Sequence, residues 1–140
     1  HVIEIHGALR HLVCTRRSCP YNAQVTTYDG LARLPKCPIC GAIVRPDVVL
    51  FEEALPESAI QQLQEELEGG FDVVFSVGTS ALFPYISLPL DVAAALGWRT
   101  VEINPDSTGL SSRVDETIRA GAAETLAALW TAYLDSRQPR

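Results

Sequence analysis

Four cysteines have the spacing that most clearly indicates a chemical site. Cys14 and Cys19 are separated by four residues and Cys37 and Cys40 by two, with a 17-residue segment between the pairs. Two close pairs joined by a loop form a tetrahedral Zn²⁺ site when each pair turns two thiolates toward one ion. Four thiolates leave no open coordination position, so the predicted zinc is structural and folds a segment that is poor in apolar residues.

Two other interpretations of the cysteines remain open. Disulfides would suit an exported protein, but the chain shows no secretory signal and its sheet pattern is typical of cytoplasmic proteins, where thiols stay reduced. A redox site is the second alternative, although it needs only two cysteines. We therefore expect zinc and a cytoplasmic location.

Small polar residues follow two apolar segments that read as buried strands. Gly78, Thr79 and Ser80 come directly after residues 71–77, and Asn104 ends the segment 100–103. Parallel sheets bind ligands at the carboxyl ends of their strands, where hydroxyl, amide and backbone groups meet phosphate or ribose. Each feature can also be an ordinary turn, and the chain has neither a G-x-G-x-x-G motif nor a P-loop.

His6 precedes Gly7 at the end of an alternating apolar and polar segment. Histidine titrates near neutral pH and can therefore act as a general base. The alternative is a structural or solvated histidine, the role that we assign to His1 and His11.

The elements that must position these residues alternate along the chain. Periodicity, helix-start signals and turn residues predict strands at 1–6, 47–51, 71–77, 100–103 and 115–120, and helices at 56–67, 89–96 and 122–134. Residues 14–40 read as an irregular insert, and 135–140 as a frayed tail. The alternation predicts an α/β fold: a mostly parallel sheet with helices on both faces.

Composition excludes several classes of function. The 140 residues are 47% hydrophobic and 20% charged, as expected of a folded domain. A net charge of −6 disfavours binding to nucleic-acid phosphates, and no apolar run reaches the roughly 18 residues of a membrane span. The chain contains no methionine, so we expect it to be a piece of a longer protein.

Taken together, these segments resemble the sirtuin family, and the resemblance covers essentially the whole chain. The matching segments occur in the family's order and at near-family spacing. They are V-I-E-I-H-G at 2–7, the two cysteine pairs, R-P-D-V-V-L-F at 45–51, E-A-L-P at 53–56, V-G-T-S at 77–80 and V-E-I-N-P at 101–105.

The resemblance implies a role for each matching residue. His6 would be the general base. The four cysteines would bind the zinc ion. Gly78, Thr79 and Ser80 would contact the ribose and phosphates of NAD. Asn104 would contact the adenosine ribose, and Val114 would lie near the adenine. Substrate contacts would come from Val49, Phe51 and Glu53, which pair with a peptide as an added strand, and from Leu82 and Phe83 in the wall of the acyl-lysine tunnel.

The family's organisation and chemistry are implied in the same way. Residues 1–13 and 41–140 would form a partial Rossmann-like NAD-binding domain without its amino-terminal part, and 14–40 a zinc-binding insert. The activity would be removal of acyl groups from lysine in a protein or peptide, with NAD consumed as co-substrate and nicotinamide and O-acyl-ADP-ribose released. Protein ADP-ribosylation and an inactive zinc-bearing binding module are the alternatives.

Three departures from the family pattern matter. The Gly-Ala-Gly phosphate loop and the Gln-Asn-x-Asp motif are absent from the chain, so we expect the chain alone to have little or no activity. Glu52 occupies the position of a family glycine, which places a charge beside the substrate strand. The spacing from Ser80 to Pro84 is one residue shorter than usual, which would reshape the tunnel wall.

Overall fold

The computed structural model describes residues 1–137 and divides the chain into two compact units. The first unit comprises His1–Glu65 and the second begins at Glu66. The boundary falls inside helix α1 (Glu57–Gly69). Residues 138–140, part of the expected frayed tail, lie outside the described residues.

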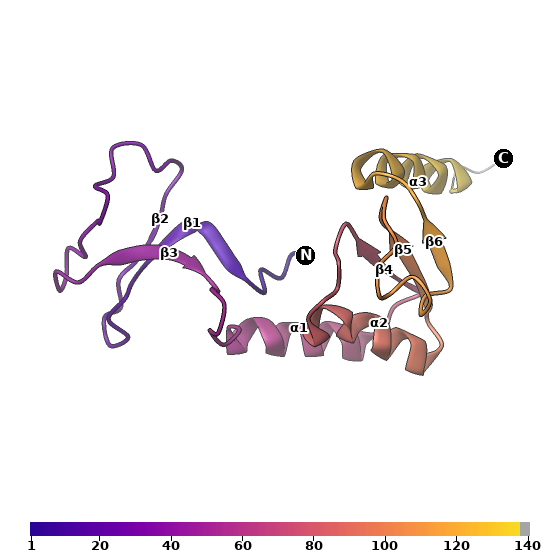
Figure 1. Ribbon diagram of the computed structural model, residues 1–140, viewed down its shortest axis with the longest axis horizontal. Helices are drawn as coiled ribbons and strands as arrows, with labels where there is room; N and C mark the ends of the chain where they lie inside the picture. The colour runs from indigo at the N-terminus through magenta and orange to yellow at the C-terminus, as the bar shows by residue number, and fades with distance from the viewer. Residues whose placement is uncertain (138–140) are drawn as a thin grey trace. The chain divides into compact units, whose positions relative to one another are not determined.

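The first unit contains a small antiparallel sheet with strand order β2-β1-β3 (Figure 1). Its strands are β1 (Gly7–Cys14), β2 (Asn22–Gln24) and β3 (Val44–Val48). Leu12, Cys37 and Val44 form the buried cluster beside this sheet, and the other three cysteines pack against it. The core of this unit is therefore built around the cysteines.

Both strands expected in this unit were placed wrongly in sequence. Residues 1–6 lie outside any strand, because β1 pairs with β3 only from Gly7, which lies opposite Val48. The second strand covers 44–48 instead of 47–51, because its pairing with β1 extends from Val48, opposite Gly7, to Val44, opposite Cys14. Alternating apolar and polar residues identify a segment with one apolar and one polar face. Such a segment becomes a strand only where another strand of the protein pairs with its backbone amides and carbonyls.

The expected insert 14–40 is less irregular than its sequence indicates. It contains β2, which pairs with β1, and a bridge joins Lys36 to Ile43. The strands that flank the insert, β1 and β3, lie in the same compact unit as the cysteines. The proposed division into a domain of 1–13 with 41–140 and an insert of 14–40 stays a prediction.

The second unit is an α/β layer built on a parallel sheet with strand order β4-β5-β6 (Figure 1). Its strands are β4 (Val73–Val77), β5 (Arg99–Ile103) and β6 (Glu116–Ile118), and its helices are α2 (Pro84–Leu96) and α3 (Ala122–Ser136). Helix α2 packs against β4 and β5. Ile103, Leu110 and Ala93 are almost completely buried. The α/β fold with a parallel sheet and helices is thus confirmed.

Strand β4 does not have the two covered faces that its apolar sequence predicts. It lies at one edge of the described sheet, with Val73 38% and Phe75 42% exposed. No residue of α3 is buried, and Trp130 on this helix is 61% exposed. Apolar surface on this unit is therefore available for cover by further protein.

The helices were predicted in the right order, with one early start missed. Helix α2 begins at Pro84, whereas the sequence placed its start at Pro89. Proline is tolerated in the first turn, where the amide that it lacks has no partner within the helix, so Pro84 rather than Pro89 marks the start. Gly97, at φ 75°, ends the helix in the left-handed conformation. None of the helices described between residues 1 and 137 has the length and apolarity of a transmembrane segment.

Candidate functional sites

The four cysteine sulfurs lie together at one point of the first unit. All four Sγ atoms are within 4.8 Å of one another, with Cys14 to Cys40 at 3.5 Å and Cys19 to Cys37 at 3.6 Å. A tetrahedral zinc with Zn–S bonds of about 2.3 Å separates its sulfurs by roughly 3.8 Å, whereas a disulfide requires about 2.05 Å. The donor set therefore fits one Zn²⁺ ion, and the thiols are free rather than paired.

The turns around the cysteines aim the sulfurs inward. The Cys37 carbonyl accepts a hydrogen bond from the Gly41 amide at 2.9 Å, which closes the second knuckle, and Gly41 adopts φ 71°. In the first knuckle the Cys19 amide donates to the Arg16 carbonyl at 2.9 Å. Backbone hydrogen bonds thus hold the turn within each cysteine pair.

The pKa values of Cys14 and Cys40 are shifted in opposite directions. Burial raises the pKa of Cys14 to about 12, whereas a hydrogen bond from the Ala42 amide lowers the pKa of Cys40 to about 7. The Ala42 amide therefore favours the thiolate form of Cys40, whereas burial favours the thiol form of Cys14. A bound metal would displace the remaining protons, because only the thiolate ligates zinc.

His6 lies in a turn just before β1. Its side chain is exposed, its carbonyl accepts a hydrogen bond from the Val49 amide at 2.9 Å, and the Gly7 amide donates to the Glu4 carbonyl at 2.8 Å. The backbone of the expected general base is thus tied to the expected substrate strand. Because His6 and the Gly78–Ser80 turn belong to different units, their juxtaposition stays a prediction.

Gly7 is required at this turn for two reasons. Its φ is 73°, and a Cβ atom built on it would lie 2.0 Å from the Asp47 carbonyl oxygen of β3. We expect Gly7→Ala to destabilise the chain by on the order of 3 kcal/mol, since both the dihedral and the contact oppose a side chain. Chemical denaturation measures the effect.

Gly30→Ala is the matched control for Gly7→Ala. Gly30 adopts φ 77°, but nothing lies within 4 Å of the position that its Cβ atom would occupy, so only the dihedral strain of about 1 kcal/mol applies. Equal losses of stability in the two variants would contradict the role given to the Asp47 contact.

A tight turn at 50–53 follows β3 and holds the expected substrate residues. The Glu53 amide donates to the Leu50 carbonyl at 3.0 Å, and the Glu53 carboxylate accepts from Arg45 at 2.7 Å and from the Leu50 amide at 3.0 Å. Those two bonds lower the pKa of Glu53, with the Arg45 bond the larger cause. Phe51 is 89% exposed at the tip, so Glu53 builds the turn while Phe51 faces solvent.

Glu52 adopts the left-handed backbone conformation, with φ 71°, at the position where the family pattern has glycine. We expect Glu52→Gly to stabilise the chain by up to ~1 kcal/mol, because the strain removed exceeds the entropy that glycine adds to the unfolded state. Thermal unfolding measures this gain. Glu53→Gly, which removes the bonds to Arg45 and Leu50, should destabilise instead; a loss in both variants would contradict the assignment of strain to Glu52.

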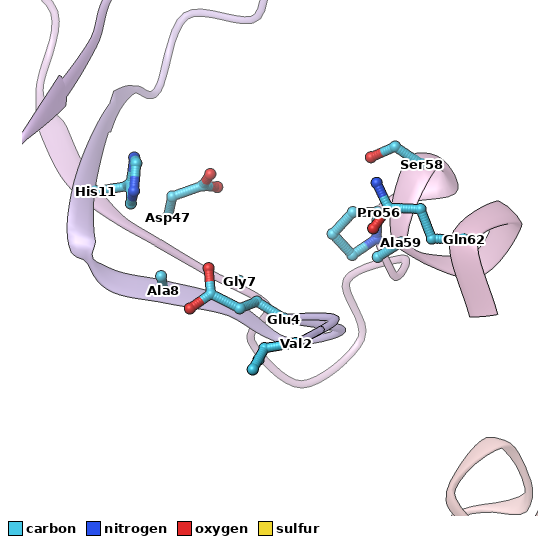
Figure 2. A pocket seen from close by; sticks show the side chains of 10 residues that line it. All are labelled: Val2, Glu4, Gly7, Ala8, His11, Asp47, Pro56, Ser58, Ala59 and Gln62. Carbon is cyan, nitrogen blue, oxygen red and sulfur yellow. The ribbon is translucent and has the colours of Figure 1, made fainter. Parts of the chain in front are cut away.

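A pocket of about 300 Å³ lies between β1, β3 and the first turns of α1 (Figure 2). Glu4, His11 and Asp47 line it on one side and Ser58 on the other, and Glu4 is also paired with Arg10 at 2.7 Å. Gly7 lines the pocket but His6 does not. The general-base prediction therefore gains no support from this pocket.

The second unit brings two of the predicted nucleotide segments together. The Gly78 amide donates to the Ile103 carbonyl at 2.9 Å, and the Asn104 side-chain amide donates to the Thr79 carbonyl at 3.1 Å. Both segments leave the carboxyl ends of parallel neighbours β4 and β5. The edge at which they meet is where open α/β sheets bind ligands.

A pocket of about 490 Å³ opens at this edge. Ser80, Leu82 and Asn104 line it, together with a loop that the sequence did not single out: Asp106, Ser107, Thr108 and Gly109. The signal available for that loop was a run of small polar residues directly after a buried strand. The pocket offers hydroxyl, carboxylate and amide groups, which suit the hydroxyls of a sugar.

Val114 and Phe83 are not among the residues that line this pocket. Val114 precedes β6, which runs parallel to β5. The next residue, Asp115, accepts a hydrogen bond from the Thr100 amide at 2.8 Å, near the start of β5. Val114 therefore lies near the amino ends of the strands, whereas Asn104 lies at their carboxyl ends. Leu82 is 82% and Phe83 47% exposed, and Phe83 caps α2. The contact of Val114 with adenine and those of Leu82 and Phe83 with an acyl-lysine stay predictions.

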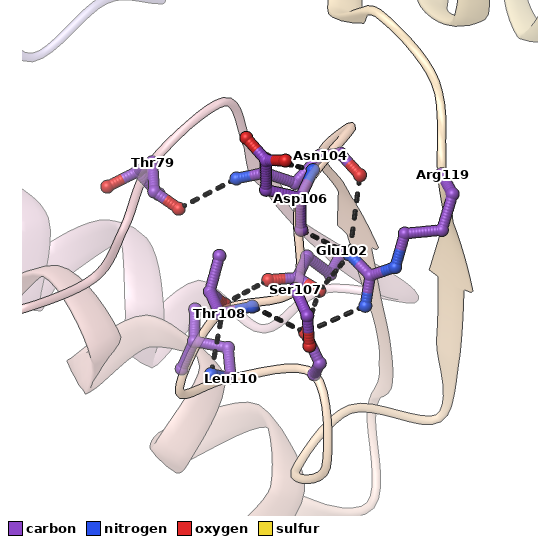
Figure 3. Close-up of polar contacts among 9 residues, drawn as sticks. Thr79, Glu102, Asn104, Asp106, Ser107, Thr108, Leu110 and Arg119 are labelled. Atoms are coloured by element: carbon purple, nitrogen blue, oxygen red, sulfur yellow. Dashed lines mark hydrogen bonds and ion pairs between the residues drawn. The ribbon is translucent and has the colours of Figure 1, made fainter.

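Behind the pocket lies a network centred on Glu102, which is completely buried. Its carboxylate accepts hydrogen bonds from the Thr108 hydroxyl, from the Ser111 hydroxyl at 2.6 Å and from Arg119 at 2.9 Å (Figure 3). Burial raises the pKa of Glu102, but the hydrogen bonds from Ser111, Thr108 and Arg119 together outweigh it and hold the pKa below its ordinary value. The carboxylate is therefore ionised at neutral pH.

Comparison with known sequences gives a consistent result. The family model described as "Sir2 family" matches residues 1–83. The chain is 43% identical over 129 residues to "NAD-dependent protein deacylase 2" of Pseudomonas syringae pv. tomato, covering 91% of this chain and 51% of the relative. It is 39% identical over 127 residues to "NAD-dependent protein deacylase 1" of Archaeoglobus fulgidus, covering 90% of this chain and 50% of the relative. The chain thus spans about half the length of the curated relatives that it matches.

Comparison with solved structures agrees. A Sir2 homolog in complex with NAD superposes with a TM-score of 0.88 at 37% identity, over 97% of this chain and 52% of that one. A Sir2 homologue in complex with 2'-O-acetyl ADP-ribose gives 0.89 at 35% identity, over 100% and 55%. The fold and the four-cysteine cluster define an α/β protein with a structural-metal unit. The chain belongs to the Sir2 family, the sirtuins.

Proposed function

We propose that this chain forms half of an NAD-dependent protein-lysine deacylase. The observation that carries the proposal is the meeting of Thr79 and Asn104 at the carboxyl edge of the sheet, beside a polar pocket, in a chain of the Sir2 family. NAD is the proposed occupant of that edge. Gly78 and Ser80 would face its phosphates and ribose, and Asn104 still has one amide hydrogen and one oxygen lone pair for a ribose hydroxyl.

The proposed chemistry transfers an acyl group from lysine to ADP-ribose. The acyl oxygen displaces nicotinamide from the ribose carbon, and His6 takes the proton of a ribose hydroxyl so that its oxygen attacks the acyl carbon. The bond from the acyl carbon to the lysine nitrogen then breaks, the amine leaves with a proton, and a water molecule supplies the oxygen of the new ester carbonyl. Free lysine, nicotinamide and O-acyl-ADP-ribose are the products. His6 is proposed as the only proton acceptor for this step among the histidines of the chain.

Zinc is assigned a structural part in this proposal. Cys14, Cys19, Cys37 and Cys40 would hold the ion, which supplies folding energy to the first unit and has no open position for a substrate. The tetrad fits that ion by its sulfur separations.

The proposed substrate is an acyl-lysine peptide that adds a strand beyond β3. Strand β3 is an edge strand of its sheet, and an edge strand is where an extended peptide can add. Phe51 and Glu53 would flank that strand, and Leu82 with Phe83 would line the acyl tunnel. A Sir2 structure with a p53 peptide and NAD shares the fold at a TM-score of 0.76 and 23% identity.

The proposal includes a segment preceding His1 that completes the NAD site. The relatives are about twice as long as this chain, and the exposed apolar residues Val73 and Phe75 on β4 are the surface that such a segment would cover. We also propose a cytoplasmic, reducing setting, which the four free thiols favour.

Product analysis tests the proposal. The full-length protein is incubated with NAD and an acetyl-lysine peptide, and the mass of the peptide is measured by mass spectrometry. Loss of the acetyl mass together with nicotinamide release is the expected result. An added ADP-ribose mass would instead identify a protein ADP-ribosyltransferase, which uses the same NAD site. Absence of both products and of NAD binding by calorimetry would indicate a zinc-bearing binding module.

A further inference from the structure

The Glu102 carboxylate fixes the orientation of two hydroxyl groups behind the sheet-edge pocket. An ionised carboxylate can only accept, so both Thr108 and Ser111 donate their hydroxyl hydrogens to it. Their oxygens are then free to accept from the backbone: the Leu110 amide donates to Thr108 at 3.1 Å, and the Thr108 amide donates to Ser111 at 2.9 Å. The shape of the loop 104–111 therefore depends on the acceptor character of one buried side chain.

Arg119 fixes the other side of the same loop. It follows β6 at the carboxyl edge of the sheet, and its Nη1 donates to the Asp106 carbonyl at 2.7 Å, to the Asn104 carbonyl at 3.3 Å and to Glu102 at 2.9 Å. Nη1 carries two hydrogens, so one of them is shared between two of these three acceptors, and Nη2 donates to the Ser111 hydroxyl oxygen at 2.7 Å. The rigid plane of the guanidinium holds all of these acceptors at fixed positions.

The network ends at the residues that face the pocket. The Asp106 amide donates to the Asn104 side-chain oxygen at 3.1 Å, and the Asn104 side-chain nitrogen donates to the Thr79 carbonyl at 3.1 Å (Figure 3). The Asn104 side chain is therefore held at both of its polar atoms. Glu102 and Arg119 are not among the residues that line the pocket, so any influence on a ligand passes through the loop.

We propose that Glu102 and Arg119 are positioning residues for nucleotide binding: they preorganise the loop 104–111 and the Asn104 side chain without touching the nucleotide. The inference rests on the proposed NAD site. A preorganised loop spares the ligand the cost of ordering it, so loosening the network weakens nucleotide affinity and leaves the chemical step intact.

Glu102→Gln is the sharpest test because it preserves size and removes one acceptor. The amide presents an oxygen to only one of the two hydroxyls and directs an NH₂ group at the other, whose hydrogen then loses its acceptor on residue 102. That hydroxyl has to reorient, which loosens the loop that its oxygen helps to hold. We expect about tenfold weaker NAD binding in the full-length protein, in line with the loss of a charge-assisted hydrogen bond. The Michaelis constant for NAD should rise by a similar factor, with kcat within about threefold of the unchanged protein.

Two further variants separate positioning from stability. Ser111→Ala removes a half-buried hydroxyl that contacts Glu102, Arg119 and the Thr108 amide, and it should weaken NAD binding in the same direction even if Glu102→Gln fails to fold. Glu116→Gln on neighbouring β6 makes the same chemical change in an exposed pair with Arg99 at 3.4 Å, and it should leave NAD affinity unchanged.

Hydrogen exchange gives a readout that is independent of turnover. Faster exchange at the amides of Asp106, Thr108 and Leu110 in Glu102→Gln or Ser111→Ala, alongside weaker NAD binding by calorimetry, supports the inference. Unchanged affinity in Ser111→Ala and in any folded Glu102→Gln would overturn it. If the unsubstituted full-length protein binds no NAD, the proposed function fails first, and the exchange data alone still report whether Glu102 orders the loop.

Discussion

Removing the metal from the four-cysteine centre is expected to unfold the first unit, His1–Glu65, while the second unit keeps its own core. The buried cluster of the first unit contains only Leu12, Cys37 and Val44, too little apolar material to stabilise a sheet of three short strands. Structural zinc supplies on the order of 10 kcal/mol of apparent binding energy in small domains, which is comparable to the whole stability of a typical domain.

The positions of the aromatic residues allow the unfolding of each compact unit to be followed separately. Both tryptophans, Trp98 and Trp130, lie in the second unit, whereas Tyr21 and Tyr28 lie in the first. After chelation, hydrogen exchange over 7–48 should lose protection while tryptophan fluorescence changes little. The expected stoichiometry is one zinc per chain.

Cys37→Ser should reproduce the effect of chelation, because Cys37 is the most deeply buried ligand at 3% exposure. Ser18→Ala, in the exposed loop between Cys14 and Cys19, is the control and should retain both zinc and protection. A zinc-free chain, verified by metal analysis, that keeps its thermal transition and the protection of β1 would refute a structural role for the ion.

The cysteine centre could be predicted because the residues that shape each half of it are close together in the sequence. Each knuckle needs only two cysteines and a turn, so the spacing from Cys37 to Cys40 with Gly41 carries most of the geometry. The meeting of Thr79 and Asn104 was also accessible, since parallel strands end at a common edge. Both predictions depend on residues close in sequence or on a topological rule.

What sequence reasoning missed depends on pairing and on three-dimensional context. The segment 1–6 alternates like a strand, yet β1 starts at Gly7 because β3 is the neighbour that it pairs with. Glu102 reads as one polar residue in a buried strand, and nothing local reveals that Arg119, after β6, neutralises it. Val114 was placed by analogy, and the direction of β6 carries it to the opposite edge of the sheet from Asn104.

His6→Ala is expected to abolish most of the proposed acyl transfer, measured in the full-length protein, without unfolding it. A positioned general base contributes about 10²- to 10⁴-fold, so the steady-state formation of free lysine from an acyl-lysine peptide should fall by at least a hundredfold. Steady-state nicotinamide release should fall with it, because the intermediate that precedes the His6 step is no longer consumed. The fold should survive because the His6 side chain is exposed and alanine keeps the backbone carbonyl that accepts from the Val49 amide at 2.9 Å. NAD affinity, measured by calorimetry, should stay within about threefold, since only kcat depends on the base.

His11→Ala is the matched histidine control. His11 lies on β1 opposite Gln24 and lines the pocket of the first unit, so its loss should leave nicotinamide release nearly unchanged. Turnover by His6→Ala equal to that of the unsubstituted protein would remove His6 from the chemistry, because no other group in the proposal accepts the ribose proton. A variant that loses both turnover and NAD affinity would instead show that the His6 side chain shapes the site, and the thermal transition then decides whether the first unit has unfolded.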